Sequence, residues 1–359
     1  MKVVSIIGAR PQFIKYNPVS KELRKCHQDV LVHTGQHYDY EMSKVFFDQL
    51  NIPKPKYNLG VGSDSHGVQT GKMLIKIEKV LLDEKPDLVL VFGDTNSTIA
   101  GALASVKLTI PLGHVEAGLR SYDRFMPEEI NRVLTDHSSN FLFAPTKLAK
   151  ENLSKEGITE GVFITGDVMF DALLENIKIA EKSDILNKFK IKSKEYFLAT
   201  VHRPSNTDIA KNLSIILESL SEIDKKIIFP IHPRTVNFIK KHGLEKKIKE
   251  NIFLTKPLGY LDFLCIEKNA LKIITDSGGI QKEAYMLQIP CITLRESTEW
   301  AETIKSGWNI LVGNNKNEII NAAIMFNPSL HNKKYKSFYG RGHASKKIIE
   351  VLDRFEEDI

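Results

Sequence analysis

The sequence has few cysteines, and they are scattered. Only three of its 359 residues are cysteines (Cys26, Cys265 and Cys291), and their separation does not match the spacing of metal ligands. An odd number of distant cysteines is typical of a protein kept in a reducing compartment. We therefore predict a cytoplasmic protein.

Long apolar runs are lacking as well. No stretch of the chain approaches the roughly 20 apolar residues that cross a bilayer. The apolar beginning of the chain is interrupted by Gly8, Arg10 and Pro11, so it indicates a first strand and not a signal peptide. We expect no insertion into a membrane.

The motifs that bind common cofactors are absent. The turn after the first predicted strand, GARPQF at 8–13, has one glycine where the dinucleotide fingerprint has three. The segment HGVQTGKM at 66–73 has its glycines one residue too close for a P-loop, and Met73 replaces the required serine or threonine. No H-E-x-x-H or clustered histidine and aspartate set indicates a metal. We expect neither NAD nor ATP as a cofactor, and no metal.

The excess of positive charge is small. The chain has 50 lysines and arginines against 44 acidic residues, a net charge of +6. This balance suits a small polyanionic substrate such as a nucleoside diphosphate. A nucleic-acid partner is not expected, because no arginine-rich block or aromatic-interleaved basic face is present. The basic stretch at 331–347 is interpreted as solvated surface.

The length of the chain exceeds the roughly 250–300 residues at which one hydrophobic core stops growing, which predicts two domains. Short β-branched runs alternate with amphipathic stretches, which is typical of doubly wound parallel α/β sheets. The strands are expected within 2–9, 29–35, 87–94, 111–118, 141–146, 161–167, 196–203, 226–232, 251–257, 271–279, 289–297 and 309–313. We therefore predict two Rossmann-like domains.

The pattern of elements starts again near 170–195, where a helix is followed by a lysine-rich, weakly apolar stretch. We place the first domain at 1–170 and the second at 171–342. The last helical pattern, within 343–359, is expected to pack back on the first domain.

Polar residues collect where the predicted strands end. Ligands of open α/β sheets bind outside the carboxyl ends of the strands, and both halves of the chain contribute residues there. We therefore predict a site in a cleft between the two domains. The residues are Arg10, Asp94, Glu116, His202, Arg203, His232, Asp276, Ser277 and Arg295.

Each of the candidate proton-transfer residues also has a structural interpretation. Asp94 precedes a helical pattern and is a possible helix N-cap. Glu116 lies among apolar neighbours, where a carboxylate needs a partner or a raised pKa. Glu128 is placed to stabilise the dipole of a helix that begins near Pro127. His202 is open to a purely structural role, and so, with more weight, are His114, His137 and His232.

The segment TDSGGIQKEA contains the clearest phosphate signal. Ser277, Gly278 and Gly279 open a predicted helix directly after a strand. Free amides at a helix start, together with the helix dipole, attract anions, and glycines let a ligand approach the backbone. The structural alternative is an ordinary glycine turn.

The chain resembles the non-hydrolysing UDP-N-acetylglucosamine 2-epimerases over nearly its whole length. The stretches that carry the resemblance are GARPQFIK, GQHYD, VFGDTNST, HVEAGLRS, MPEEINR, FAPT, TVHR, TDSGGIQKEA and LRESTEW. The resemblance implies a GT-B-like fold, a homodimer and a place in the synthesis of cell-envelope polysaccharide.

Family roles carry over to the matching positions of this sequence. The resemblance makes Asp94, Glu116 and Glu128 the catalytic carboxylates, and His202 a catalytic histidine beside the diphosphate. It implies loss of UDP from C1 together with the C2 proton, then re-addition of UDP after protonation on the other face. The positions that it assigns to binding UDP or the sugar are Arg10, Lys15, His202, Ser277, Gly278, Gly279, Glu283, Arg295 and Glu302.

Within this family, three stretches are similar to the branch acting on UDP-2,3-diacetamido-2,3-dideoxyglucuronic acid. They lie at 57–74, 166–173 and 306–313, and the loop HRPSN at 202–206 also departs from the simpler members. Bacterial members bind a second, regulatory UDP-sugar through glutamines, whereas this chain reads YDYEM at 38–42. That departure argues against the regulatory site.

Three other functions stay open at this point. A GT-B glycosyltransferase shares the UDP site but needs an acceptor pocket. A hydrolysing epimerase releases free sugar, and its relatives tend to depart from the segment HVEAGLRS. A UDP-sugar sensor without activity is disfavoured, because extra carboxylates weaken the binding of an anion.

Overall fold

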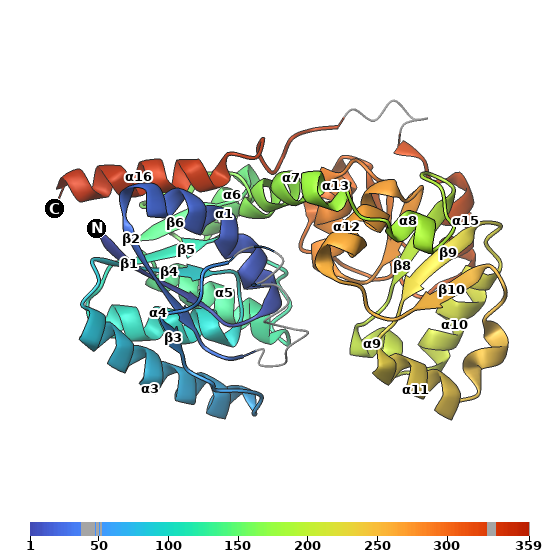
Figure 1. The fold of residues 1–359 in the computed structure, drawn as a ribbon, viewed down its shortest axis with the longest axis horizontal. Helices are drawn as coiled ribbons and strands as arrows, with labels where there is room; N and C mark the ends of the chain where they lie inside the picture. The colour runs from blue at the N-terminus through green and yellow to red at the C-terminus, as the bar shows by residue number, and fades with distance from the viewer. Residues whose placement is uncertain (37–46, 48–49, 51, 329–334, 359) are drawn as a thin grey trace. The chain divides into compact units, whose positions relative to one another are not determined.

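The computed structural model describes residues 1–359 except 37–46, 48–49, 51, 329–334 and 359, and the chain forms two compact units (Figure 1). The first unit is Met1–Glu175 together with Phe338–Ile359, and the second is Asn176–Ser337. The domain boundaries predicted from the sequence were at 170/171 and 342/343.

The first unit contains a seven-stranded, fully parallel sheet in the order β3-β2-β1-β4-β5-β6-β7. The predicted class of fold is confirmed. Strand β3 was not predicted, because two residues are too short to show a pattern. The strands are β1 (Lys2–Ile7), β2 (Gln28–His33), β3 (Tyr57–Asn58), β4 (Leu88–Phe92), β5 (Leu112–Val115), β6 (Phe141–Ala144) and β7 (Val162–Ile164).

The helices of the first unit lie on both faces of this sheet. Helices α3 and α4 pack on one face against Val4, Ile6 and Val91, while α1 and α16 lie on the other (Figure 1). A strand covered on both faces must be apolar along its whole length, and β4 is buried at each of its positions. The helices are α1 (Arg10–Cys26), α3 (His66–Glu84), α4 (Asn96–Lys107), α5 (Pro127–Ser138), α6 (Lys147–Lys155) and α16 (Ala344–Asp358). Helix α7 (Val168–Ala180) begins in the first unit, and its residues from Asn176 onward belong to the second.

The second unit contains a six-stranded parallel sheet in the order β10-β9-β8-β11-β12-β13. Its strands are β8 (Tyr196–Thr200), β9 (Lys226–Pro230), β10 (Ile252–Thr255), β11 (Lys272–Thr275), β12 (Cys291–Thr293) and β13 (Asn309–Leu311). Its helices are α8 (Ile185–Lys188), α9 (Pro204–Thr207), α10 (Ala210–Ser221), α11 (Pro233–Lys241), the 3₁₀ turn Leu244–Lys247, α12 (Tyr260–Asn269), α13 (Gly278–Met286), α14 (Ala301–Lys305) and α15 (Lys316–Met325).

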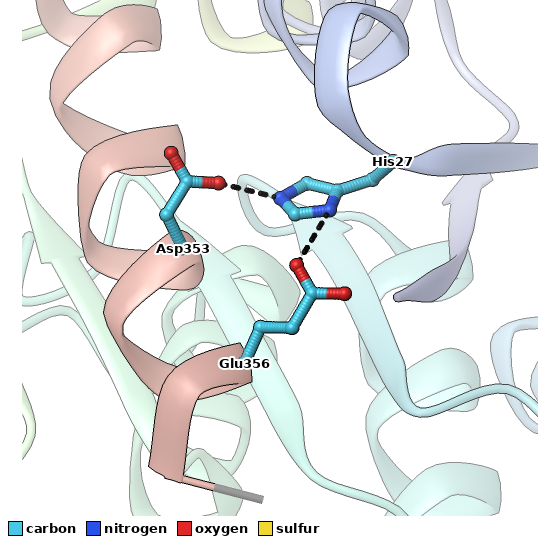
Figure 2. A group of neighbouring side chains, drawn as sticks. All are labelled: His27, Asp353 and Glu356. Carbon is cyan, nitrogen blue, oxygen red and sulfur yellow. Dashed lines mark ion pairs between the residues drawn. The ribbon is translucent and has the colours of Figure 1, made fainter.

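The C-terminal helix α16 belongs to the first unit and packs against α1. The carboxylate of Asp171 accepts hydrogen bonds from the backbone amides of Ala344 (3.1 Å) and Ser345 (2.7 Å) at the start of α16. Near the other end, the buried His27 ring lies between two carboxylates (Figure 2). Its Nε2 is 2.9 Å from Asp353 Oδ1, and its Nδ1 is 3.4 Å from Glu356 Oε2.

Each sheet has one point where the order of its strands reverses, and such points are the usual ligand sites of open α/β sheets. In the first unit it lies between β1 and β4, and in the second between β8 and β11. The residues that follow these strands are those that the sequence singled out.

Candidate active site

Three predicted residues follow neighbouring strands of the first sheet. Arg10 is the first residue of α1, just after β1. Asp94 comes two residues after β4, and Glu116 directly follows β5. Because β1, β4 and β5 are adjacent and parallel, their carboxyl ends share one edge of the sheet. The first unit therefore gathers these side chains at its reversal point.

Glu116 forms a buried ion pair with Lys15. The side chains of Glu116 and Lys15 are 6% and 10% exposed, and the lysine ammonium donates to Glu116 Oε2. The predicted need of Glu116 for a partner is therefore met by a residue 101 positions away. The backbone of Glu116 has φ 77°, a left-handed conformation that costs energy in a residue with a β-carbon. Strain of this kind is common at functional sites.

Gly93 makes room for this ion pair. A β-carbon built on Gly93 would lie 2.9 Å from Lys15 Nζ and 3.5 Å from Glu116 Oε2. Gly93 also has φ 64°, which glycine adopts without strain. The close approach explains why a glycine stands between β4 and Asp94.

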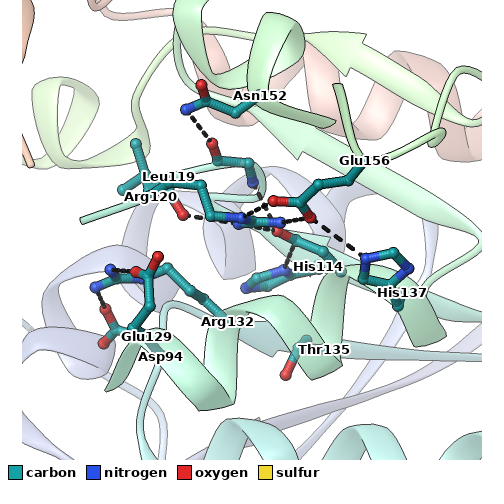
Figure 3. A network of polar contacts seen from close by, with 12 residues as sticks. Asp94, His114, Leu119, Arg120, Glu129, Arg132, Thr135, His137, Asn152 and Glu156 are labelled. Atoms are coloured by element: carbon teal, nitrogen blue, oxygen red, sulfur yellow. Dashed lines mark hydrogen bonds and ion pairs between the residues drawn. The ribbon is translucent and has the colours of Figure 1, made fainter. Parts of the chain in front are cut away.

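Asp94 is held by an arginine and does not cap α4. Its Oδ2 lies 2.6 Å from Arg132 Nη2, and the same guanidinium pairs through Nη1 with Glu129 (Figure 3). The N-cap of α4 is Thr95, so the interpretation of Asp94 as a helix cap is wrong. Burial lowers the pKa of Arg132, but the charges of Asp94 and Glu129 outweigh it and raise the pKa above the usual value. Arg132 thus holds Asp94 and Glu129 together through one guanidinium.

The two adjacent glutamates at the start of α5 differ. Glu129 is buried and accepts hydrogen bonds from the amides of Ser121 and Tyr122, both 2.9 Å. Burial raises its pKa, but these amides and Arg132 together hold the pKa below its usual value. Glu128 is exposed, and no ion pair joins its carboxylate to any residue in the described part of the chain. Glu128 is therefore the carboxylate of the two that a ligand can reach.

A second buried network holds the segments around Glu116. His114 Nδ1 is 2.6 Å from Asp136 Oδ1, and its Nε2 is 2.7 Å from the carbonyl oxygen of Gly93. Asp136 also accepts from Arg120 Nη1 (2.6 Å), and Arg120 binds Glu156 through two nitrogens at 2.7 Å. His114 thus has the structural role that was given more weight.

In the second unit, His202 is oriented by a buried aspartate. Asp276 is fully buried, and its Oδ1 lies 3.1 Å from His202 Nδ1. The amides of His202 and Arg203 and the side-chain amide of Asn206 also donate to Asp276. Burial raises the pKa of Asp276, but His202 and these donors together hold it below the usual value. With Nδ1 turned to the aspartate, Nε2 of the exposed histidine faces away from it.

The predicted phosphate loop, residues 277–279, has free space beside Gly279 but a glutamate side chain beside Gly278. Ser277 is the N-cap of α13, and its hydroxyl makes no capping hydrogen bond to that helix. A β-carbon on Gly279 would have no atom nearer than 4.0 Å, whereas one on Gly278 would lie 2.2 Å from Glu299 Oε1. The helix start therefore offers a free side at Gly279.

The other predicted binding residues of this unit surround α13. Glu283 lies on α13 and Glu302 on α14, and both are buried. Arg295 follows β12, and its Nη1 lies 2.9 Å from Glu299 Oε2. His232 caps α11, where its Nδ1 accepts from the amide of Arg234 at 3.2 Å. His232 thus has a structural contact, as expected.

One group of side chains in the described residues has ligand atoms close enough for a metal ion, namely His27, Asp353 and Glu356. The two carboxylates face different nitrogens of the histidine ring (Figure 2). A histidine binds one ion through one nitrogen, whereas here each ring nitrogen lies next to a different carboxylate. It lies at the end of α16 and apart from the residues named above.

Sequence reasoning gave no role to Asp276, Glu129 or Arg132. Asp276 was recognised at a strand end, but its contact with His202 joins residues 74 positions apart. Glu129 and Arg132 are three residues apart on α5, a spacing that places two helical side chains on one face. The ion pair between Glu129 and Arg132 could therefore have been predicted from their spacing in the sequence.

Two predicted segments cannot be followed in full. Part of GQHYD (35–39) and all of YDYEM (38–42), on which the regulatory site depends, lie outside the described residues. The predicted cleft between the two domains stays a prediction.

The sequence matches the family model for UDP-N-acetylglucosamine 2-epimerase over residues 21–353. The chain belongs to the UDP-N-acetylglucosamine 2-epimerase family. This confirms the resemblance inferred from the motifs, and members of this family are isomerases that act on UDP-sugars.

Named relatives agree with the family. A UDP-N-acetylglucosamine 2-epimerase homolog of Methanococcus maripaludis is 59% identical, and the alignment covers 98% of this chain and 99% of that protein. A UDP-2,3-diacetamido-2,3-dideoxy-D-glucuronate 2-epimerase of Pseudomonas aeruginosa is 44% identical, covering 98% of this chain and 99% of that protein. Both substrate branches expected from the sequence are thus represented among the relatives.

A solved structure shares the fold. The crystal structure of Methanocaldococcus jannaschii UDP-GlcNAc 2-epimerase in complex with UDP-GlcNAc and UDP has a TM-score of 0.89 and 50% identity to this chain. The match covers 99% of this chain and 100% of that one. The GT-B-like class of fold is confirmed.

Proposed function

We propose that this chain interconverts UDP-N-acetylglucosamine and UDP-N-acetylmannosamine without hydrolysis. The observation that carries the proposal is the set of carboxylates at one edge of the first sheet, in a member of this family. Asp94 and Glu116 are each paired with a cation, while Glu128 is exposed. Removal and delivery of a proton need a basic and an acidic group at the reacting carbon, and carboxylates are common in both roles.

The chemistry explains why several carboxylates are needed. The hydrogen at C2 is not acidic, because no adjacent carbonyl stabilises a carbanion. Loss of UDP from C1 lets the electron pair of the C2–H bond form a C1–C2 double bond, while a carboxylate takes the proton. Protonation of C2 from the other face and attack of UDP on C1 complete the inversion. We propose that Asp94, Glu116 and Glu128 share these proton transfers.

The second unit supplies groups suited to holding UDP while it is detached. The start of α13 at residues 277–279 combines an uncapped serine with a glycine that has open space beside it. Free amides at a helix start favour phosphate. His202, oriented by Asp276, is proposed to direct Nε2 to the diphosphate. Arg10, Lys15, Glu283, Arg295 and Glu302 are proposed as further contacts to UDP or the sugar.

Among the substrates of the family, we propose UDP-N-acetylglucosamine first. The UDP-N-acetylglucosamine 2-epimerase homolog of Methanococcus maripaludis is 59% identical, whereas the diacetamido-glucuronate epimerase is 44% identical. Incubation with each UDP-sugar separately, without NAD or an acceptor, and separation of the nucleotide sugars tests this choice. Faster epimerisation of the diacetamido-uronate would reassign the substrate but not the reaction. Appearance of free sugar would point to the hydrolysing class, and turnover that needs an acceptor would point to a glycosyltransferase.

We propose that the enzyme forms a homodimer through the first unit. Val68, Ile75 and Leu82 lie seven residues apart along α3 and are 46%, 69% and 56% exposed. A seven-residue spacing is about two helical turns, so they form one apolar stripe. The sequence did not reveal this stripe. Analytical ultracentrifugation of wild type and Ile75→Glu tests it, since a charge on the stripe is expected to favour the monomer.

We also propose that the enzyme works in the cytoplasm in the synthesis of cell-envelope polysaccharide. Its cysteines Cys26, Cys265 and Cys291 are free thiols, as expected in a reducing compartment. Among the described residues, no helix has the length and apolar character needed to cross a bilayer.

A further inference from the structure

Glu299 lies between the arginine and the helix start that are proposed to bind UDP. Its Oε2 is 2.9 Å from Arg295 Nη1, in the loop that joins β12 to α14. Its Oε1 lies on the side of Gly278, where a β-carbon would come within 2.2 Å of it. One carboxylate therefore contacts both the guanidinium of Arg295 and the first residue of α13.

This ion pair is buried but poorly hydrogen-bonded. The side chains of Arg295 and Glu299 are 9% and 10% exposed. Neither Arg295 Nη1 nor Glu299 Oε2 forms a hydrogen bond with any described residue, although the two atoms are close. The buried Nε2 of Gln281, on the first turn of α13, likewise has no acceptor there. Buried donors without acceptors are costly to a fold, so their presence here points to an anionic ligand.

The charges around α13 also favour an exchange of partners. A helix start attracts negative charge, and in this structure the carboxylate beside Gly278 is that of Glu299. A phosphate group offers more acceptor oxygens than a carboxylate and can satisfy an arginine through two parallel hydrogen bonds. Arg295 therefore gains hydrogen bonds when a phosphate replaces Glu299 as its partner.

We infer that Glu299 is a positioning residue that acts as the resident counter-ion of Arg295 and competes with the diphosphate of the UDP-sugar for it. This inference rests on the proposed function, in which residues 277–279 and Arg295 hold UDP. Competition from Glu299 weakens the binding of UDP and of the UDP-sugar to a similar degree. Because the competition acts equally on the ground state and the transition state, it raises KM without changing kcat.

The test is the affinity for UDP of purified full-length variants, measured by isothermal titration calorimetry. Glu299→Gln keeps the shape of the side chain and an acceptor for Arg295 while it removes the charge. We expect it to lower the Kd for UDP about tenfold, equal to about 1.4 kcal/mol. In steady-state assays, KM should fall without a rise in kcat. Glu299→Asp, which withdraws the carboxylate by one methylene, should shift Kd in the same direction by a smaller factor.

A matched control separates the local contact from a general effect of charge. Glu296→Gln removes the same charge from an exposed position three residues away, and its Kd is expected to stay within about twofold of wild type because solvent screens exposed charges. In the background of Arg295→Gln, the change Glu299→Gln should no longer tighten UDP binding.

Unchanged or weaker binding of UDP by a folded Glu299→Gln would overturn the inference, and so would equal tightening in Glu296→Gln. Tightening that persists in the Arg295→Gln background would show direct repulsion and not competition for the arginine. Failure of wild type to bind UDP is a different result, because it would overturn the proposed function itself.

Discussion

The two units differ in how several of their buried charged groups are partnered. In the first unit, the buried carboxylates of Glu116, Glu129 and Asp136 each have a cationic partner in place. In the second, Arg295 and Glu299 face each other without a hydrogen bond, and the fully buried oxygens of Glu267 have no partner in the described chain. These carboxylates of the first unit are thus paired before a ligand arrives, while Arg295 of the second unit keeps hydrogen-bonding capacity that a ligand can satisfy.

The difference has a physical basis. Proton transfer needs acids and bases whose charge states and positions are set in advance. Retention of a leaving group needs donors that are not already satisfied, since a satisfied donor gains little from a new partner. The predictions below test this contrast from the largest expected effect to the smallest.

The largest effect is expected for the preset charge at Glu116. Glu116→Gln removes the carboxylate but keeps its size, and it should lower the rate of epimerisation by roughly 10²–10⁴-fold, as is typical for loss of a general acid or base. Binding of UDP should persist, because its anchor lies in the second unit. Steady-state kinetics and calorimetry with UDP measure both. The exposed Glu151, changed to Gln, is the control, and a wild-type rate in Glu116→Gln would remove Glu116 from the catalytic set.

A large loss of stability is expected for Asp136, which binds His114 and Arg120. Asp136→Asn leaves the buried guanidinium of Arg120 without this anionic partner and removes the carboxylate that faces His114, and removal of one member of a buried pair costs about 3–5 kcal/mol. Unfolding in urea at pH 7 measures this loss. A loss below about 1 kcal/mol would show that the network is not tightly coupled to the fold.

The same network gives a pH dependence with a defined sign. Burial raises the pKa of Asp136, but His114 and Arg120 outweigh it and lower the pKa below the value of an unfolded aspartate. The unfolded chain therefore binds the proton first as pH falls. Stability from this group should be complete at neutral pH and decrease as pH falls below the unfolded value. Asp136→Asn should reduce this decrease, and an unchanged pH profile would contradict the assignment.

A smaller effect, a gain in stability, is expected when Glu267, the buried acid without a hydrogen-bond partner in the described part of the second unit, is replaced. Burial, and then the charge of Glu283, raise the pKa of Glu267 well above its usual value. Glu267→Met has a similar volume and no polar atoms, so it should stabilise the protein by about 1–3 kcal/mol at pH 8. A raised acid pKa destabilises the fold more as pH increases, so the gain should be smaller at pH 5. Glu267→Gln, which keeps a polar group, should stabilise less, and destabilisation by Glu267→Met would show an undetected partner.

Much of the fold was predictable because parallel strands covered on both faces must be apolar throughout. The apolar runs of β4 and β11 could be recognised as strands directly from the sequence. The polar residues after them could be assigned to the site because the carboxyl ends of parallel strands lie at the same edge of a sheet. The strand β3 could not be found, since two residues show no periodicity.

The contacts between side chains within the sites were harder to predict from the sequence. The pairing of Lys15 with Glu116 joins residues 101 positions apart, and no local rule selects it. The adjacent glutamates 128 and 129 look alike in sequence, and only the turn of α5 decides that Glu129 is buried. Likewise, the contact of Glu299 with Gly278 depends on how the loop after β12 returns to α13.

The central claim is that the enzyme removes and returns the proton at C2 while UDP stays available for re-addition. Incubation of wild type with UDP-N-acetylglucosamine in D₂O, without NAD or an acceptor, followed by NMR of C2, tests it most directly. The account predicts UDP-N-acetylmannosamine and recovered substrate that both carry deuterium at C2, with the nucleotide still attached. Epimerisation without deuterium, or the absence of any exchange at C2, would contradict it.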